Sequence, residues 1–377
     1  MRLTVKVKLV PTSEEYNALL GTLELCNKAA NEISEYAYKN NVKRKYDLHY
    51  AQYTRVKELG LAAQATVRTI AKVADAYTTQ TGSIKSGALK GKRKAKALSK
   101  PITFRKDAGQ AFDRNNLSYS LEHRTVSIWS VQGRLKAIAF QCSEEHLELL
   151  RSYRKGESDL VLDNGVFYLL TGVEIPEQPL REIDDYLAFD SGIVNIATTS
   201  DGDNWSGGAV TLRRKKNRAL RAKLQSKGTK SAKRLLKKRS KKESRFVKDT
   251  NHVISKKIVQ LALHTGRGIA HENLKGIREQ ARSSKPLRTE LNNWAFAQLF
   301  QFVAYKARLA GIPVKIVNPA YSSQLCPQCG TIGRANRPSR DIFTCSSCAL
   351  TGPADIIAAR NIRSFALTGS VNTPHAV

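Results

Sequence analysis

The chain has 377 residues, of which 41% are hydrophobic and 25% are charged. These proportions exclude a chain that is disordered throughout, and no apolar run approaches the about 18 residues that a membrane-spanning helix needs. The formal net charge of +31, from 63 Lys and Arg against 32 Asp and Glu, predicts a polyanionic partner: nucleic acid first, and an anionic membrane surface second.

The N-terminal segment predicts a strand followed by helices. Residues 3–9 alternate between apolar and polar side chains, which is typical of a half-buried strand. Pro11 ends this strand, and Thr12 with Glu15 predicts a capping box at the start of a helix. Further helical periodicity is present at 49–59 and 63–77.

Residues 82–100 form a basic segment with seven Lys or Arg and no acid. Because Gly and Ser separate the cations, the segment predicts a mobile connection that becomes ordered against phosphate. The alternative is a linker that serves only solubility.

Residues 101–176 change to a period of two, which predicts short strands. The strands are expected at 117–121, 125–129, 135–140, 160–162 and 166–173. The last two are joined across Asp163-Asn164-Gly165, a strong hairpin signal. Together with residues 3–9 these strands predict a small β-barrel that a helical insertion interrupts, followed by a linker at 175–179.

From residue 184 onward, strands alternate with helices, which predicts an α/β core. Strands are expected at 186–189, 193–199, 205–211, 268–271 and 314–317, and helices at 253–264, 291–310 and 354–365. Between them, residues 213–248 contain 18 Lys or Arg and one acid, Glu243. With a break at Ser226-Lys227-Gly228, this segment predicts two basic helices folded as a hairpin that binds phosphate, rather than a merely solvated face.

Four of the six cysteines lie in two C-x2-C knuckles, at Cys326, Cys329, Cys345 and Cys348. Four thiolates at this spacing predict one tetrahedral Zn²⁺ that is structural, because no ligand position is left open for chemistry. The arginines between the knuckles (Arg334, Arg337 and Arg340) could contact a nucleic-acid backbone. The isolated Cys26 and Cys142 are expected to be buried thiols.

Three acidic residues occupy positions that suit a metal-dependent phosphodiesterase. Asp190 and Glu272 each end an apolar strand, and Asp355 begins a helix just beyond the cysteines. Carboxylates at such ends can converge on two Mg²⁺ ions, which activate water and stabilise the leaving oxygen. Local sequence alone favours a turn former or helix cap at each of these three positions, and His271 beside Glu272 is more simply structural.

Four segments in this order resemble the RuvC-like nuclease domain of the TnpB family. They are LAFDSGIVNIATTSDG, GIAHENLKGI, YKARLAGIPVKIVNPAYSSQLCPQCG and FTCSSCALTGPADIIAARNI, with the basic hairpin after the first. TnpB proteins are transposon-encoded RNA-guided nucleases regarded as ancestral to type V CRISPR effectors. The resemblance covers nearly all of 184–366 in detail.

The resemblance implies a domain plan of α+β type. Residues 1–10 and 101–180 would form a wedge β-barrel, and 11–100 a helical recognition insertion with its basic linker. Residues 184–377 would form a RuvC-like domain of RNase H fold; its insertions would be the basic hairpin 213–248 and a zinc ribbon at 322–350.

The resemblance also assigns the site residues. The family's three catalytic acids, which bind Mg²⁺, fall on Asp190, Glu272 and Asp355, and its zinc ligands fall on the four cysteines. This sequence departs from the family at Ile357, where Asn is frequent, and at Ser191, where Leu or Pro is common. Neither change removes a metal ligand.

The implied function is RNA-guided, Mg²⁺-dependent cleavage of double-stranded DNA beside a short adjacent motif, in association with a transposable element. The implied partners are a guide RNA and the DNA target, with no membrane, and the protein would act as a monomer with its RNA. Because the N-terminus also lacks a signal-peptide core, we expect a cytoplasmic, nucleoid-associated protein. The alternatives are a nuclease-inactive RNA-guided repressor, a miniature type V CRISPR effector and a DDE-type transposase.

Overall fold

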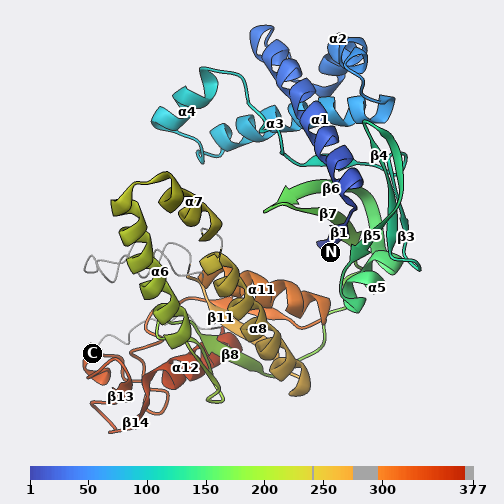
Figure 1. The fold of residues 1–377 in the computed structure, drawn as a ribbon. Helices are drawn as coiled ribbons and strands as arrows, with labels where there is room; N and C mark the ends of the chain where they lie inside the picture. Colours follow the sequence, from blue (N-terminus) through green and yellow to red (C-terminus); the bar gives the residue numbers. More distant parts are fainter. Residues whose placement is uncertain (240–241, 275–295, 370–377) are drawn as a thin grey trace. The chain divides into compact units, whose positions relative to one another are not determined.

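The computed structural model describes residues 1–239, 242–274 and 296–369. The chain forms two units, Met1–Pro176 and Glu177–Val377 (Figure 1). Each unit contains a β-sheet with its own core and helices packed on it. The predicted mixed α and β multidomain class is therefore confirmed in its coarse form. Of the described helices, none is both long enough and apolar enough to cross a membrane.

The first unit begins with β1 (Arg2–Val10) and a helical part made of α1 (Ser13–Lys39), α2 (Lys45–Glu58), α3 (Ala63–Lys85) and α4 (Gly91–Leu98). The predicted capping box is confirmed: the Glu15 amide donates to the Thr12 hydroxyl at 3.2 Å, and the Thr12 amide donates to the Glu15 carboxylate at 2.8 Å. Cys26 is buried among α1 and α3, and this burial raises the pKa of its thiol to about 11.

The basic connection differs from its prediction. We expected an irregular mobile segment, yet α3 extends through Lys85 and residues 91–98 form α4. Lys and Ala, which favour helices, alternate through Lys92–Leu98, and this local preference outweighs the glycines that precede it. No residue of α4 is buried, so its cations remain exposed to solvent.

The remaining strands of the first unit form a seven-stranded antiparallel sheet in the order β2-β6-β7-β1-β5-β4-β3. The added elements are β2 (Gln110–Phe112), β3 (Leu117–Ser120), β4 (Thr125–Ser130), β5 (Gly133–Gln141), α5 (Glu144–Tyr153), β6 (Arg154–Asp163) and β7 (Val166–Glu174). The predicted hairpin is confirmed, since Asn164 and Gly165 adopt φ of 54° and 78° between β6 and β7.

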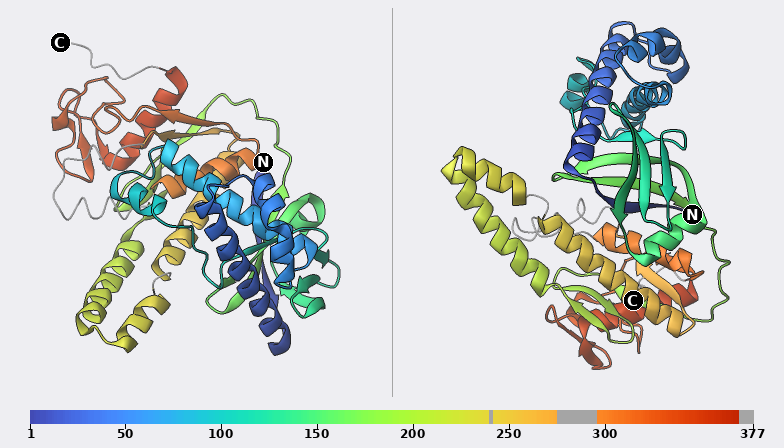
Figure 2. Two further views of the ribbon diagram at one scale, coloured as in Figure 1. Left: turned by 90° about the horizontal axis from the view of Figure 1, so that it is seen from above. Right: turned by 45° about the vertical axis from the view of Figure 1, so that its right-hand side comes forward.

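This sheet curls back on itself around a single core (Figure 2). Tyr119 on β3 hydrogen-bonds Thr171 on β7 at 2.7 Å, and Arg154 on β6 lies over the Tyr119 ring at 5.0 Å, although several strands separate β3 from β6 and β7 in the sheet. The predicted barrel is therefore present as a near-closed sheet. Cys142 is half-buried beside this core.

The second unit is built on a mixed five-stranded sheet in the order β10-β9-β8-β11-β12. The strands are β8 (Tyr186–Asp190), β9 (Asn195–Thr199), β10 (Asn204–Ser206), β11 (Gly268–Glu272) and β12 (Val314–Val317). The first three are antiparallel neighbours, whereas β11 runs parallel to both β8 and β12. The order places β8 and β11 side by side in the interior of the sheet, although their first residues are 82 positions apart in the chain (268 − 186).

Helices cover both faces of this sheet. Leu187 and Phe189 pack with α8 (Lys242–His264) and α11 (Phe296–Leu309), whereas Ala188 packs with α12 (Ala354–Thr368). Alternate residues of one strand thus contact opposite layers, as the period of two requires. The first five residues of the predicted helix 291–310 lie outside the described residues.

The basic segment contains two helices, α6 (Gly208–Lys227) and α7 (Lys230–Arg239), which confirms the predicted helical pair. The break falls at Gly228, whose φ of 62° ends α6 in a left-handed cap. The predicted strand 205–211 is wrong in its second half, because β10 ends at Ser206 and α6 begins at Gly208. Its β-branched residues favoured a strand locally, but Val210 is buried in the core from the helix.

Candidate active site

Asp190 and Glu272 lie at the ends of neighbouring parallel strands. The last paired residues of β8 and β11 are Phe189 and His271. Asp190 and Glu272 are the next residues of the two strands, so they occupy neighbouring positions. Glu272 is 8% exposed, whereas Asp190 is partly buried. Parallel strands end at the same edge of a sheet, and this topology places both carboxylates there.

The two carboxyl groups share a poorly solvated space. Burial, together with the charge of Asp190, raises the pKa of Glu272 to about 8. Burial and the charge of Asp355 raise the pKa of Asp190 to about 6, against the opposing influence of the Arg337 guanidinium. The Glu272 Oε1 atom is buried and has no hydrogen-bond partner among the described residues. This oxygen would be stabilised by a cation.

Asp355 is the second residue of α12, which packs on the face of the sheet opposite α8 and α11. The Asn195 amide donates to its Oδ2 at 2.8 Å, and the Arg337 guanidinium donates to its Oδ1 at 3.2 Å. The structure thus brings Asp190 into electrostatic range of both Glu272 and Asp355. Asp190 connects the trio electrostatically, because its charge raises the pKa of Glu272 and the charge of Asp355 raises the pKa of Asp190.

Asn195 is a residue of this site that the sequence analysis missed. It accepts a hydrogen bond from the Asn204 amide at 3.1 Å while it donates to Asp355, so it links β10 to the start of α12. The turn before it depends on Gly192, whose amide donates to the Asn195 carbonyl at 2.9 Å. A Cβ at Gly192 would lie 2.8 Å from that carbonyl oxygen. In the sequence, the glycine two residues after Asp190 is the sign of the tight turn that positions Asn195.

His271 is a structural residue beside the acids. Its ring is buried between Phe189, at 4.5 Å, and Phe300, at 5.1 Å between centroids, and its Nε2 lies 3.1 Å from the Ser191 hydroxyl. Burial lowers the pKa of His271 to about 4, which keeps the ring neutral. A neutral, stacked imidazole orders the end of β11 and adds no charge to the site.

The four predicted cysteines form a cluster: Cys326, Cys329, Cys345 and Cys348, with all their sulfur atoms within 4.8 Å of one another. The Cys326 and Cys348 sulfurs are 3.6 Å apart, and those of Cys329 and Cys345 are 3.5 Å apart. A tetrahedral ion with metal–sulfur bonds of about 2.3 Å spaces its ligands by about 3.8 Å. In the described part of the chain, no other set of His, Cys, Asp and Glu is gathered this closely.

Local structure holds the cysteine cluster together. The second knuckle lies between β13 (Ile342–Thr344) and β14 (Thr351–Pro353), which pair antiparallel. Buried Asn336 connects the two knuckles, because its amide donates to the Gln324 and Thr331 carbonyls while its oxygen accepts from the Ser346 amide. Hydrogen bonds with the side chain and the backbone of Thr331 lower the pKa of Cys329 to about 6, toward the thiolate form.

The helical pair α6 and α7 presents a strongly cationic surface. Glu243, the single acid of residues 213–248, lies 3.8 Å from Arg214 and 3.9 Å from Arg221. One carboxylate cannot balance the charge of 18 cations, so the hairpin carries a large net positive charge.

Two family models match parts of the chain. One, described as a probable transposase, matches residues 171–277, which include the ends of β8 and β11. The other, described as the Cas12f1-like TNB domain, matches residues 296–362, which include the cysteine cluster and Asp355.

Two curated relatives extend this result. The CRISPR-associated endodeoxyribonuclease Cas12f1 of Syntrophomonas palmitatica is 28% identical over 240 residues, 59% of this chain and 47% of that protein. A TnpB-like protein of Methanocaldococcus jannaschii is 37% identical over 149 residues, 39% of this chain and 52% of that protein. The chain is thus similar to TnpB-like and Cas12f proteins. Its matches span about half the length of these two relatives.

Solved structures agree with this relationship at the level of the fold. The mini-RNA-guided endonuclease CRISPR-Cas phi3 aligns with 99% of this chain and 93% of its own, with a TM-score of 0.56 at 10% identity. CasPhi-2 (Cas12j) bound to crRNA aligns with 98% of this chain and 99% of its own, with a TM-score of 0.54 at 12% identity. At these identities the alignments show a shared fold.

Proposed function

We propose that the protein is an RNA-guided DNA endonuclease of a transposable element, which hydrolyses phosphodiester bonds of double-stranded DNA beside a short adjacent motif. The observation that carries the proposal is the buried Glu272 Oε1 at the strand end next to Asp190, which has no hydrogen-bond partner among the residues that the structure describes. Buried acceptors without a partner are a minority in folded proteins, and a bound ion or water is one way in which such an atom is satisfied. The relationship to TnpB-like and Cas12f proteins supports the same reading.

The donor set fits divalent cations. Asp190, Glu272 and Asp355 offer only hard carboxylate oxygens, which suit Mg²⁺. Burial raises the pKa values of Asp190 and Glu272, so a cation would stabilise their charged forms. These three residues would hold the two proposed Mg²⁺ ions, which when bound supply water activation and stabilisation of the leaving oxygen. Asn195 orients the Asp355 carboxylate, and Arg337 offsets part of the negative charge. The proposed domain is RuvC-like, and its mixed sheet supports this.

We further propose that the cysteine cluster binds one structural Zn²⁺. Sulfur spacings of 3.5 Å and 3.6 Å support four thiolate ligands. The cluster stands directly before α12, since β14 ends at Pro353 and Asp355 follows two residues later. The ion would thus stabilise the segment that delivers the third carboxylate to the site.

The proposed partners are a guide RNA and its DNA target, which a monomer would bind in the cytoplasm. The net charge of +31 and the cationic helices α6 and α7 support binding to a phosphate backbone. In such a complex, base pairing with the guide reads the sequence, and the protein holds the heteroduplex by its backbone.

Two variants of this proposal remain as alternatives. A miniature type V CRISPR effector is favoured by the similarity to Cas12f1, and would differ in taking its guide from a CRISPR array. A nuclease-inactive RNA-guided repressor would have the same partners without catalysis, and the intact trio of acids argues against it. RNA that copurifies with the protein distinguishes the first alternative by its sequence.

The test is cleavage of a plasmid library carrying randomised flanking sequence, by protein purified with its own RNA, in Mg²⁺ and then in EDTA. We expect cutting in Mg²⁺ only. Asp190→Ala should abolish cutting and leave RNA binding unchanged, whereas Asp184→Ala, an exposed acid of the same unit, should leave both unchanged. Full cleavage by Asp190→Ala would remove Asp190 from the site, and no cleavage by the unaltered protein would leave only the repressor.

A further inference from the structure

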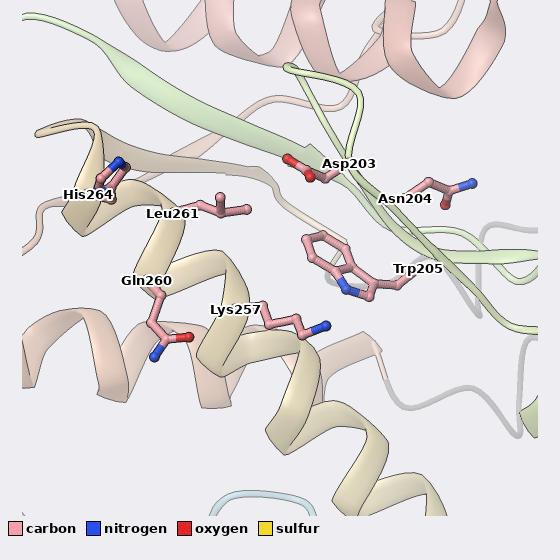
Figure 3. Close-up of a pocket in the computed structure, with 7 residues that line it drawn as sticks. All are labelled: Asp203, Asn204, Trp205, Lys257, Gln260, Leu261 and His264. Carbon is pink, nitrogen blue, oxygen red and sulfur yellow. The ribbon is translucent and has the colours of Figure 1, made fainter.

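A cleft of about 410 Å³ lies between β10 and α8 (Figure 3). Its strand side consists of Asp203, Asn204 and Trp205. Its helix side consists of residues at three- and four-residue steps along one face of α8: Lys257, Gln260, Leu261 and His264. It contains none of the three proposed catalytic acids and none of the cations of α6 and α7.

Trp205 provides a fixed aromatic surface in this cleft. The indole is partly buried and packs against the core of the second unit, which limits its motion. The Trp205 side chain makes no hydrogen bond to any residue that the structure describes. An anchored indole that borders open space offers a planar face on which another ring can stack.

The polar side chains of the two walls differ in whether they form hydrogen bonds within the protein. On the strand wall, Asp203 accepts from the Thr199 hydroxyl at 3.2 Å and Asn204 accepts from the Thr198 hydroxyl at 3.3 Å. On the helix wall, exposed Lys257 forms no ion pair or hydrogen bond within the described ranges. In the view of Figure 3 the Trp205 ring lies between Asp203 and Lys257. The cleft therefore combines hydrogen-bonded polar side chains on the strand side, the aromatic face of Trp205, and the Lys257 ammonium group, which can bind a ligand.

We propose that this cleft binds one unpaired nucleotide of a single-stranded nucleic acid, with its base stacked on Trp205 and its phosphate paired with Lys257. The volume falls in the range of about 300–1,000 Å³ for small-molecule sites. A purely apolar ligand would leave Lys257 unused, and an acidic peptide would leave the indole face unused. A base inside a duplex is stacked on both faces already, so the ligand is a single strand.

This contact goes beyond the proposed function, because it needs nucleic acid but neither divalent metal nor cleavage. Guide RNA and displaced DNA present the same chemistry of base and phosphate. A failed nuclease assay would therefore leave the cleft proposal standing, and an empty cleft would leave the nuclease proposal standing.

The test uses Trp205 as its own reporter. The chain has three tryptophans, so replacing Trp129 and Trp294 by Phe leaves the fluorescence of Trp205 alone. Oligoadenylate as RNA and as DNA, the matching duplex, and an abasic strand of equal length are titrated in EDTA, and total binding is followed in parallel by anisotropy. We expect saturable quenching by one or both single strands, and little by the duplex or the abasic strand.

Charge variants complete the design. Lys257→Ala should weaken the binding that quenching reports and lower the slope of log K against log salt by about 0.7, the loss of one single-strand phosphate contact. Lys256→Ala removes the same charge from the next residue, which is exposed but does not line the cleft, and should leave the quenching curve unchanged. Preferential quenching by RNA or by DNA identifies the source of the strand.

Two results would overturn the proposal. The first is the absence of Trp205 quenching at strand concentrations where anisotropy shows binding. The second is quenching that Lys256→Ala weakens as much as Lys257→Ala does. Trp205→Leu, which keeps an apolar contact with the core, checks the reporter: with an unchanged melting temperature it should bind abasic and base-containing strands equally, and retained preference for bases would count against stacking.

Discussion

Replacing Glu272 by Gln should make the metal-free protein more stable and unable to cut DNA. The pKa of Glu272 is about 8 in the folded state against 4.5 for the ordinary side chain, so the folded state favours the protonated form. The contribution of the protonated Glu272 carboxyl to the stability of the folded state is fully present below about pH 4.5 and is lost as the pH rises through 8. At pH 7 the difference in ionisation opposes folding by about 3 kcal/mol, which the uncharged amide avoids.

The assay is denaturant unfolding of wild type and Glu272→Gln in EDTA between pH 5 and 8, repeated with Mg²⁺. Without metal, the advantage of the variant should grow with pH. With Mg²⁺, the wild type should gain stability and the variant should gain much less, because it lacks one carboxylate ligand. Glu182→Gln, an exposed acid of the same unit, is the matched control and should change neither. A pH-independent difference between Glu272→Gln and wild type would refute the reasoning.

Three further predictions concern the neighbours of the site. Asn195→Ala should raise the Mg²⁺ concentration for half-maximal cleavage by about tenfold, because the 2.8 Å bond that orients Asp355 is lost; unchanged Mg²⁺ dependence in a cleavage titration would contradict this. Gly192→Ala should lower the free energy of unfolding by about 1–3 kcal/mol in urea melts, since its Cβ would lie 2.8 Å from a backbone oxygen. Cys345→Ser should release about one Zn per chain in a metal assay and lower the melting temperature, whereas Cys142→Ser, outside the cluster, should retain the metal.

Features with strong local chemistry were predictable from the sequence. The Thr12–Glu15 capping box and the Asn164-Gly165 turn depend on neighbouring residues alone, and both are confirmed. The cysteine cluster was predictable because two C-x2-C pairs have few other uses at that spacing. The order of strands in the second unit was not predicted, since each pairing joins segments that are far apart in the chain.

The surroundings of the acids could not be predicted, because their contacts join residues that are far apart in the chain. Asn195 and Asp355 are 160 residues apart, and their hydrogen bond exists only because α12 returns to the sheet. The sequence allowed Arg337 a contact with a nucleic-acid backbone, but gave no sign that its guanidinium donates to Asp355. The helix at 91–98 was missed for the opposite reason. Its Lys and Ala residues show a helical preference locally, but the prediction gave more weight to the charge and glycine content of the segment.

The position of β1 has a consequence for the synthesis of this protein. It lies at the centre of the seven-stranded sheet, between β7 and β5, and pairs Arg2 with Glu174. Because β1 leaves the ribosome before either neighbour, it must wait, unpaired and half apolar, until both β5 and β7 have emerged. The helices α1 to α3 have their own core and can fold during that interval. Slower elongation through codons 100–174 should accordingly increase chaperone dependence more than the same delay placed later.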